Sequence, residues 1–148
     1  DLGPDLSRGF RALKVWFAIA GFGTEKLGQV VTRSCALARG LAEQVQATPY
    51  LQLLAPVSLN VVCFRVVTSE VDDLDWLNGE LVKDLQVSGV VAPSTTRVGG
   101  VLAIRVALVN HRTTEADVAI LLDALHSFME VRLAQVRMMA AVEGVAQA

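Results

Sequence analysis

The chain has 148 residues, of which 53% are hydrophobic and 19% charged, and its formal net charge is −2. This length allows one domain with a substantial core, and the charged fraction lies below the roughly 25% of an average soluble domain. The charge balance and the absence of a lysine- or arginine-rich tract argue against nucleic acid as a partner. The apolar excess predicts that a partner covers some apolar surface.

The sequence also argues against a membrane-spanning segment and a metal site. The longest charge-free stretch, residues 44–64, contains prolines and several polar residues, so it predicts no transmembrane helix. The N-terminus is not a signal peptide and does not begin with Met, so we expect a fragment or a processed product. Cys35 and Cys63 form no CxxC pair and have no metal-ligand spacing to the histidines, so we expect buried, reduced thiols in a cytoplasmic protein.

Apolar residues at spacings of three and four predict two helices at the start of the chain. The first covers residues 7–20, with Ser7 as its N-cap, and it ends at Gly21-Phe22-Gly23. The second covers residues 24–47. One row of the first helix is basic, which is typical of a solvated helix face: Arg8, Arg11 and Lys14.

Two apolar runs in the middle of the chain predict strands. Residues 50–54 have the length of an edge strand. Residues 60–67 are apolar on both faces except at Arg65, as expected for a central strand.

A third helix and a hairpin follow these strands. Ser69 and Asp72 open the predicted helix, whose apolar inner side extends to Leu85. Residues 87–98 are predicted to be extended. The pair Gly99-Gly100 then suits a two-residue hairpin turn, because such a turn needs a positive φ.

The strand after this turn, residues 101–109, alternates between a bulky face and a face of mostly small residues. On the second face Arg105 lies between Ala103 and Ala107. These small neighbours leave room for the guanidinium to present its fork to a carboxylate or a phosphate. A solvent-facing arginine or a structural ion pair would produce the same pattern. The bulky face carries Leu102, Ile104, Val106 and Leu108.

The chain ends in a helix that we predict over residues 114–141, with a frayed tail beyond Glu143. Thr114 and Asp117 have the spacing of a capping box, with Asp in place of the usual Glu or Gln. Together these elements predict an α+β fold: a three- or four-stranded, mainly antiparallel sheet with helices on one face.

The sequence contains no nucleophile elbow, no phosphate-cradling glycine loop and no metal-ligand cluster. Its lysines, Lys14, Lys26 and Lys83, fall in helical patterns without the desolvated pocket that a Schiff-base lysine needs. The residue patterns alone therefore describe an α+β domain with apolar surface and one well-placed arginine.

Three segments in order resemble the group II pyridoxal-phosphate-dependent amino-acid decarboxylases, which include the aromatic-L-amino-acid and glutamate decarboxylases. Residues 6–17, LSRGFRALKVWF, resemble the family's LxRxFRxLKxWF segment and are closest to the aromatic subgroup. Residues 55–65 resemble its LxLVCFR strand, and residues 104–114 resemble its C-terminal LR-[FVM]-x-[IL]-x-N-x-x-[TA]-T segment. The chain departs from the family pattern at two positions. Gly9 stands where a second arginine is usual, and His111 stands where proline is common. The second departure leaves the role of the turn around His111 open.

The resemblance implies a homodimeric enzyme of fold type I whose large domain binds pyridoxal phosphate through a lysine that follows a histidine. None of the lysines here follows a histidine. The chain then corresponds to a connecting helix, residues 1–22, and the C-terminal small domain, residues 23–148, with the cofactor bound by a domain outside the chain. Arg105 matches the arginine that holds the substrate carboxylate in the glutamate decarboxylase branch.

The resemblance therefore predicts part of a decarboxylase that acts on an aromatic or related L-amino acid. Its partners are then its own N-terminal cofactor domain, a second copy and the small-molecule amino acid, with no nucleic acid and no membrane. Two other hypotheses stay open. One is a stand-alone, non-catalytic α+β module that binds a carboxylate or a protein, and the other is a non-catalytic remnant of a decarboxylase fold.

Overall fold

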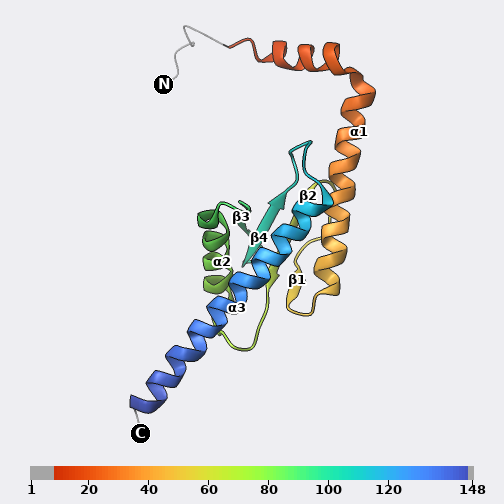
Figure 1. Cartoon of the computed structure of the whole chain (residues 1–148). Coiled ribbons are helices and arrows are strands. Elements are labelled where there is room, and N and C mark those ends of the chain that lie inside the picture. Colours follow the sequence, from red (N-terminus) through yellow and green to blue (C-terminus); the bar gives the residue numbers. More distant parts are fainter. Residues whose placement is uncertain (1–8, 147–148) are drawn as a thin grey trace. The chain divides into compact units, whose positions relative to one another are not determined.

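The computed structural model describes residues 9–146, which form seven helices and strands (Figure 1). The chain divides into two compact units, Asp1–Arg33 and Ser34–Ala148. The predicted N-cap Ser7 lies outside the described residues. Within the described part, no helix combines the length and the apolar character needed to cross a bilayer.

Helix α1 (Arg11–Ala47) contains the break that the sequence predicts between its first two helices. Gly23 has φ 75° and ψ 160°, a conformation that is not helical and that is nearly restricted to glycine. The apolar side chains before this break are exposed, and Trp16 and Phe17 have exposed fractions of 61% and 59%. This first part of α1 therefore presents apolar surface and no core of its own.

The sheet has four antiparallel strands in the order β1-β2-β4-β3. This topology confirms the predicted fold class, with the short run as an edge strand and the longer run in the centre. The strands are β1 (Leu51–Leu53), β2 (Val61–Val66), β3 (Ser94–Val98) and β4 (Val101–Ala107). The hairpin turn is also confirmed, because Gly99 and Gly100 have φ values of 58° and 87°.

Helix α2 (Leu74–Ser88) differs from its prediction at both ends. Asp73 is the N-cap in place of Ser69 or Asp72, because its side chain accepts a 2.8 Å bond from the Trp76 N–H. The helix then continues to Ser88 and is followed by a turn, so the predicted extended conformation was wrong for residues 87–90. Gly89 ends the helix in the left-handed conformation, which glycine adopts without strain.

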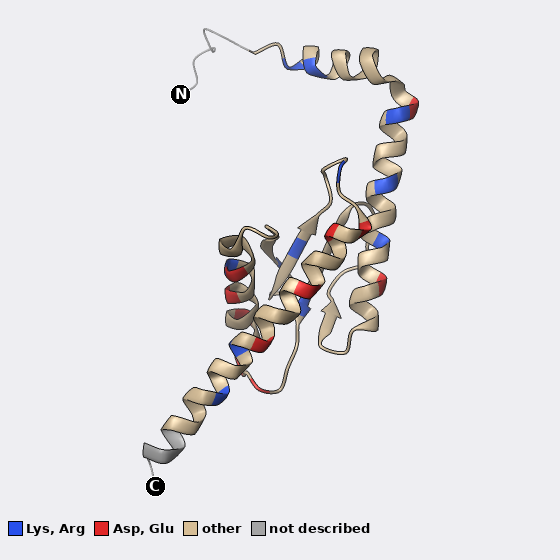
Figure 2. Ribbon diagram, viewed as in Figure 1, with Lys and Arg blue, Asp and Glu red and all other residues tan. Residues whose placement is uncertain are grey.

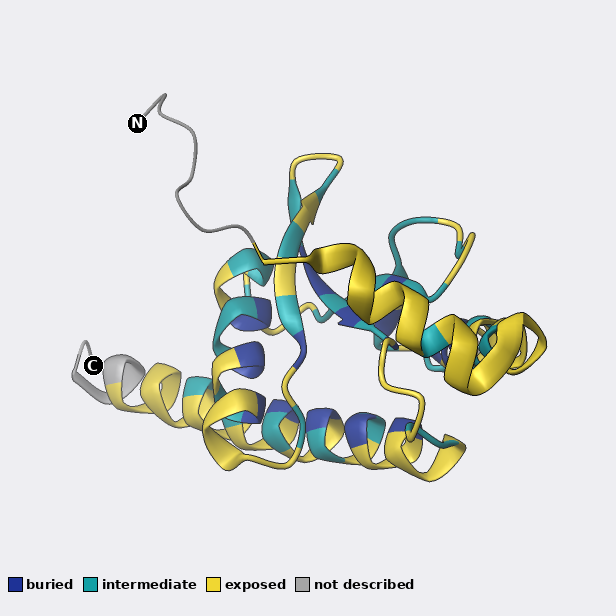
Figure 3. Ribbon diagram, turned by 90° about the horizontal axis from the view of Figure 1, so that it is seen from above, coloured by how far each residue is buried: buried dark blue, intermediate teal, exposed yellow. Residues whose placement is uncertain are grey.

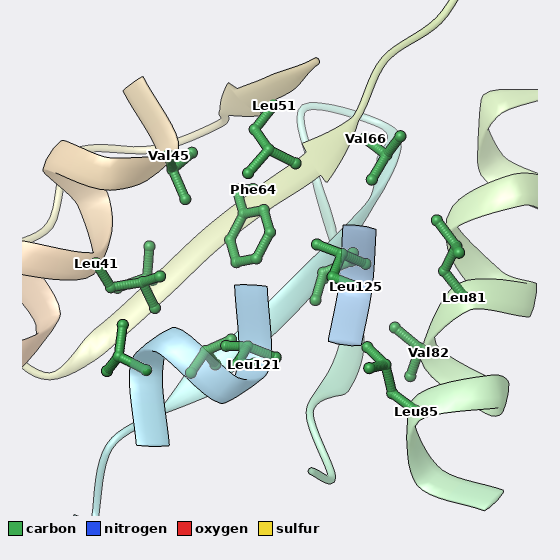
Figure 4. Packing of buried hydrophobic residues seen from close by; sticks show 14 of the residues in the cluster. Leu41, Val45, Leu51, Phe64, Val66, Leu81, Val82, Leu85, Leu121 and Leu125 are labelled. Carbon is green, nitrogen blue, oxygen red and sulfur yellow. The ribbon is translucent and has the colours of Figure 1, made fainter. Parts of the chain in front are cut away.

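The core lies on one face of the sheet and is built around Phe64 of β2 (Figure 4). Its cross-strand partner Ile104 points to the same face, because paired residues in a sheet share a face. The second part of α1, α2 and α3 (Glu115–Ala146) all contribute buried residues to this cluster, and their buried sides face inward (Figure 3). Helices on one face are thus confirmed for the second unit.

Two polar side chains near the start of α2 form hydrogen bonds with backbone groups of β2 and β4 at the point where these strands separate. The last paired position between these strands is Phe64 with Ile104. Beyond it, Asn78 accepts from the Val66 N–H at 2.8 Å and donates to the Val66 carbonyl at 2.9 Å. Asp75 accepts from the Leu102 N–H at 2.9 Å. The helix thereby satisfies backbone groups that a neighbouring strand would otherwise bind.

Candidate substrate-binding site

A pocket of about 380 Å³ opens beside β4, at the point where β3 begins. The first pair between the two strands is Ser94 with Arg105, so β4 continues past the start of β3 without a partner on that side. The segment before β3 and the start of α3 form the other walls. Polar groups of Ser94, Arg105, Thr113 and Asp117 line the pocket, together with apolar residues that include Leu108 and Leu121.

Arg105 lies half-buried on the face of the sheet opposite the core. Its neighbours on that face are Ala103 and Ala107, as the strand alternation predicts. Its Nη1 donates to Ser94 Oγ at 3.3 Å, and Ser94 Oγ donates to the Arg105 carbonyl at 3.4 Å. Among residues 9–142, no carboxylate lies within salt-bridge distance of this guanidinium. The structural ion pair considered from the sequence is therefore not formed within this part of the chain.

Asp117, the carboxylate in the pocket wall, is engaged by the start of α3. Its Oδ2 accepts from the Thr114 N–H and from Thr114 Oγ1, each at 2.8 Å. These bonds confirm the predicted pairing of the two residues at this helix start. They also lower the pKa of Asp117 below its ordinary value of 3.8, with the backbone N–H as the largest cause. Asp117 is thus a helix-capping carboxylate at neutral pH.

The other candidate residues lie away from this pocket. Cys35 and Cys63 are free and half-buried, and no group of three metal-ligating side chains occurs among the described residues. Lys83 pairs with Glu80 and its side chain is 68% exposed, while Lys26 lies over the ring of Phe22 at 5.5 Å. No lysine lines the pocket, so these residues do not fit a Schiff-base site for pyridoxal phosphate.

Charged residues are scattered along the described helices without a block of one sign (Figure 2). Arg11 and Lys14 of the predicted basic row are exposed, and Arg8 lies outside the described residues. His111 is exposed in the turn before α3. Arg11, Lys14 and His111 do not belong to the pocket lining.

The sequence interpretation singled out Arg105 but missed Ser94 beside it. The signal was present in the hairpin, because a two-residue turn at Gly99-Gly100 pairs Val98 with Val101. Four residues further along each strand, the same register places Ser94 opposite Arg105. The pocket walls could not be found in this way, because Thr113 reaches the pocket only through tertiary packing.

Comparison with known proteins connects this domain to one enzyme family. Residues 3–67 match the model of the pyridoxal-dependent decarboxylase conserved domain. An aromatic-L-amino-acid decarboxylase from Bacillus atrophaeus is 32% identical over 120 residues, which are 79% of this chain and 25% of that protein. The chain is similar to members of the pyridoxal-dependent decarboxylase family over most of its length. This confirms the resemblance found in the sequence, and pyridoxal phosphate is the cofactor of the family.

Solved structures of decarboxylases share the fold of this chain. The glutamate decarboxylase domain of a diaminobutyrate-pyruvate transaminase and L-2,4-diaminobutyrate decarboxylase from Vibrio parahaemolyticus is 28% identical with a TM-score of 0.73, over 80% of this chain and 25% of that one. Tryptophan decarboxylase from Catharanthus roseus, solved with L-tryptophan, is 26% identical with a TM-score of 0.74, over 83% of this chain and 27% of that one. The chain thus spans about a quarter of the length of the relatives it matches.

Proposed function

We propose that this chain is the C-terminal small domain of a pyridoxal-phosphate-dependent L-amino-acid decarboxylase, a carboxy-lyase. Residues 1–22 would be the connecting helix from a cofactor-binding domain and residues 23–148 the small domain. The family match and the α+β fold support this assignment. The pocket holds no lysine, so the cofactor would be bound by the rest of the parent protein. When bound, that cofactor supplies the electron sink for the electron pair left by the departing carbon dioxide.

In this proposal Arg105 binds the carboxylate of the substrate. The observation that carries the role is a half-buried guanidinium in a pocket of about 380 Å³ with no carboxylate partner among residues 9–142. A guanidinium can donate two parallel bonds to one carboxylate, which fixes the orientation of that group as well as its charge. Arg105 would thereby keep the bond between Cα and the carboxylate carbon, which breaks in decarboxylation, in a constant orientation.

The substrate is proposed to be an aromatic or related L-amino acid. The Bacillus atrophaeus relative, at 32% identity, supports the aromatic class, and the Vibrio parahaemolyticus structure, at 28% identity, supports a related diamino acid. We further propose that the parent enzyme is a cytoplasmic homodimer. The free thiols suit a reducing compartment, and the exposed Trp16 and Phe17 support contact with a covering surface.

The Arg105→Lys variant of the full-length parent protein tests this role. Lysine keeps the charge but cannot form the two parallel bonds. Losing one charge-assisted bond costs about 1.5–3 kcal/mol, so kcat/KM for the L-amino acid should fall about ten- to a hundredfold. The melting temperature should stay nearly unchanged.

Arg97→Lys is the matched control, because Arg97 lies in the same hairpin but outside the pocket, bonded to Asp75 at 2.9 Å. Its kcat/KM should remain close to the wild-type value. An Arg105→Lys protein with unchanged kcat/KM and a clearly lower melting temperature would show a structural arginine and refute the substrate role.

A carboxylate-binding module without chemistry would use the same arginine. Both walls of the pocket come from this chain, which is the observation that favours this second function. Decarboxylation by the parent protein distinguishes the two, because a binding module would retain the amino acid and release no carbon dioxide.

A further inference from the structure

We infer that Ser94 is a positioning residue that decides which edge of the Arg105 guanidinium faces the substrate. This inference rests on the proposed role of Arg105 as the carboxylate-binding residue. It adds a second residue to that site and specifies the geometry of the bound group. Three observations support it: the Ser94 hydroxyl contacts Arg105, the backbone before Ser94 is anchored to α2, and one edge of the Arg105 guanidinium has no partner among residues 9–142.

The Ser94 hydroxyl contacts both the main chain and the side chain of Arg105. Its Oγ donates to the Arg105 carbonyl at 3.4 Å and accepts from Arg105 Nη1 at 3.3 Å. A serine hydroxyl has one donor and two acceptor positions, so it can make both bonds at once. Both distances are long for hydrogen bonds, so each contact is weak by itself, but together they join the hydroxyl to two groups of the same residue.

Ser94 is itself held in place from the opposite side of the sheet. It is the first residue of β3, and the preceding Pro93 is buried. The carbonyl of Pro93 accepts a 2.7 Å bond from Gln86 Nε2 of α2. Because proline also restricts its own φ, the backbone that enters β3 has little freedom at this point. The Ser94 hydroxyl is therefore presented to Arg105 from a fixed backbone.

Other arginines of this chain show which edge of the guanidinium grips a carboxylate with two bonds. Arg132 donates to Asp84 through Nε and Nη2, both at 2.7 Å. Arg137 donates to Glu70 through the same two nitrogens, at 2.5 and 2.7 Å. Arg97 instead uses Nη1 and contacts only one oxygen of its carboxylate.

Arg105 gives Nη1 to Ser94, so its Nε–Nη2 edge is the one left for a ligand. No hydrogen bond from these two nitrogens to residues 9–142 occurs in the structure. The geometry therefore points to a single planar carboxylate that binds side-on, with one oxygen on Nε and the other on Nη2. Without the serine hydroxyl, the guanidinium could rotate and present Nη1 in a one-bond contact.

Ser94→Ala and Ser94→Thr in the full-length holoenzyme test the inference. The probe is the L-amino acid that the wild type decarboxylates fastest among L-tryptophan, L-tyrosine and L-2,4-diaminobutyrate, together with its amine product as an inhibitor. Ser94→Ala should raise KM for the amino acid about three- to tenfold, the size of one lost hydrogen bond, and leave the inhibition constant of the amine unchanged. Ser94→Thr retains a hydroxyl and should remain within about twofold of the wild type.

A double variant shows whether Ser94 acts through Arg105. In an Arg105→Lys background, Ser94→Ala should have no further effect on KM, since the edge that it positions no longer exists. An equal loss in both backgrounds, or an equal loss for amino acid and amine, would overturn the inference. If Arg105→Lys raises KM but Ser94→Ala does not, only the inference fails. If neither variant changes KM, or if no probe is decarboxylated, the proposed function fails with it.

Discussion

At the scale of single residues, the buried side-chain amide of Asn78 forms the hydrogen bonds that a neighbouring strand would otherwise form with Val66. It has no solvent exposure, and all of its hydrogen bonds go to backbone groups: the N–H and carbonyl of Val66 and the carbonyl of Leu74, at 2.8–2.9 Å. Its role is distinct from that of the surrounding apolar core, because it satisfies polar groups that burial would otherwise leave unpaired.

The Asn78→Leu variant should therefore be strongly destabilised although leucine has a similar size. Leucine leaves the Val66 N–H and carbonyl without partners, and each unsatisfied buried group costs about 1–3 kcal/mol. We expect the free energy of unfolding, measured by urea denaturation of this chain, to fall by about 2–4 kcal/mol. Asn110→Ala, at an exposed turn position, is the control and should change little. Equal stability of Asn78→Leu and wild type would contradict this account.

At the scale of elements, Asp75 connects three parts of the second unit. It belongs to α2, accepts from the Leu102 N–H of β4 at 2.9 Å and pairs with Arg97 of β3 at 2.9 Å. The bond from the backbone N–H, followed by that from Arg97, lowers the pKa of Asp75 below its ordinary value of 3.8. The lowered pKa makes the attachment of α2 to the sheet dependent on pH.

The sign of this dependence follows from proton linkage. A carboxyl whose pKa is lowered in the folded state binds its proton less readily there than in the unfolded chain. It therefore stabilises the fold above pH 3.8, and this contribution is lost as the pH falls through the lowered pKa. The stability difference between wild type and Asp75→Asn should be largest near neutral pH and should shrink on acidification. Urea titrations at several pH values measure it, and a difference that grows towards acid would contradict the linkage.

Local signals explain which elements could be predicted from the sequence. The alternation around Arg105, the glycine pair of the hairpin and the spacing of Thr114 and Asp117 each act within a few residues, and each is found as predicted. The position of Arg105 in β4 and the antiparallel sheet followed from these signals. Its role as a ligand for substrate stays a prediction.

The misassigned parts are those in which tertiary contacts choose between similar local options. Asp72 and Asp73 are equally good caps in isolation, and Asp73 is selected where α2 inserts Asp75 and Asn78 between two strands. Helix α2 packs against β4 and α3 as far as the buried Leu85, and its last turn is closed by the left-handed Gly89. The pocket was not predictable for the same reason, since tertiary packing brings together its three wall segments, residues 91–94, 105–108 and 113–121.

At the scale of the whole molecule, the lysines of this chain are not expected to form a Schiff base with pyridoxal phosphate. Its lysines are solvent-exposed or paired on helices, and none lines the pocket. Incubation with pyridoxal phosphate, borohydride reduction and mass spectrometry should therefore give no specific adduct on this chain alone. The full-length parent, treated in the same way, is the positive control. A specific reduced adduct on Lys14, Lys26 or Lys83 would refute the expectation.

The exposed apolar side chains of the first unit predict a second property of the isolated chain. Phe10, Trp16, Phe17 and Phe22 have exposed fractions of 59–71%, which is unusual for aromatic residues without a covering surface. The chain should therefore self-associate or bind an apolar dye more than a typical domain of its size. Replacing Trp16 and Phe17 by glutamate should reduce both effects.

Val87→Glu is the matched control for that experiment, because Val87 is 88% exposed but belongs to α2. It should leave dye binding and association nearly unchanged. A monodisperse, monomeric wild type with negligible dye binding would argue against an uncovered apolar surface.

The hairpin at Gly99-Gly100 requires glycine because of its backbone conformation and not because a side chain would lack space. This turn sets the register in which β3 pairs with β4 beside the pocket. A Cβ atom added at either glycine meets nothing within 4 Å, yet both residues have a positive φ that L-amino acids rarely adopt. The mirror-image residue D-alanine prefers positive φ, so it would preserve the turn where L-alanine strains it. The pairing of Ser94 with Arg105 thus depends on the backbone handedness of two residues that do not line the pocket beside β4.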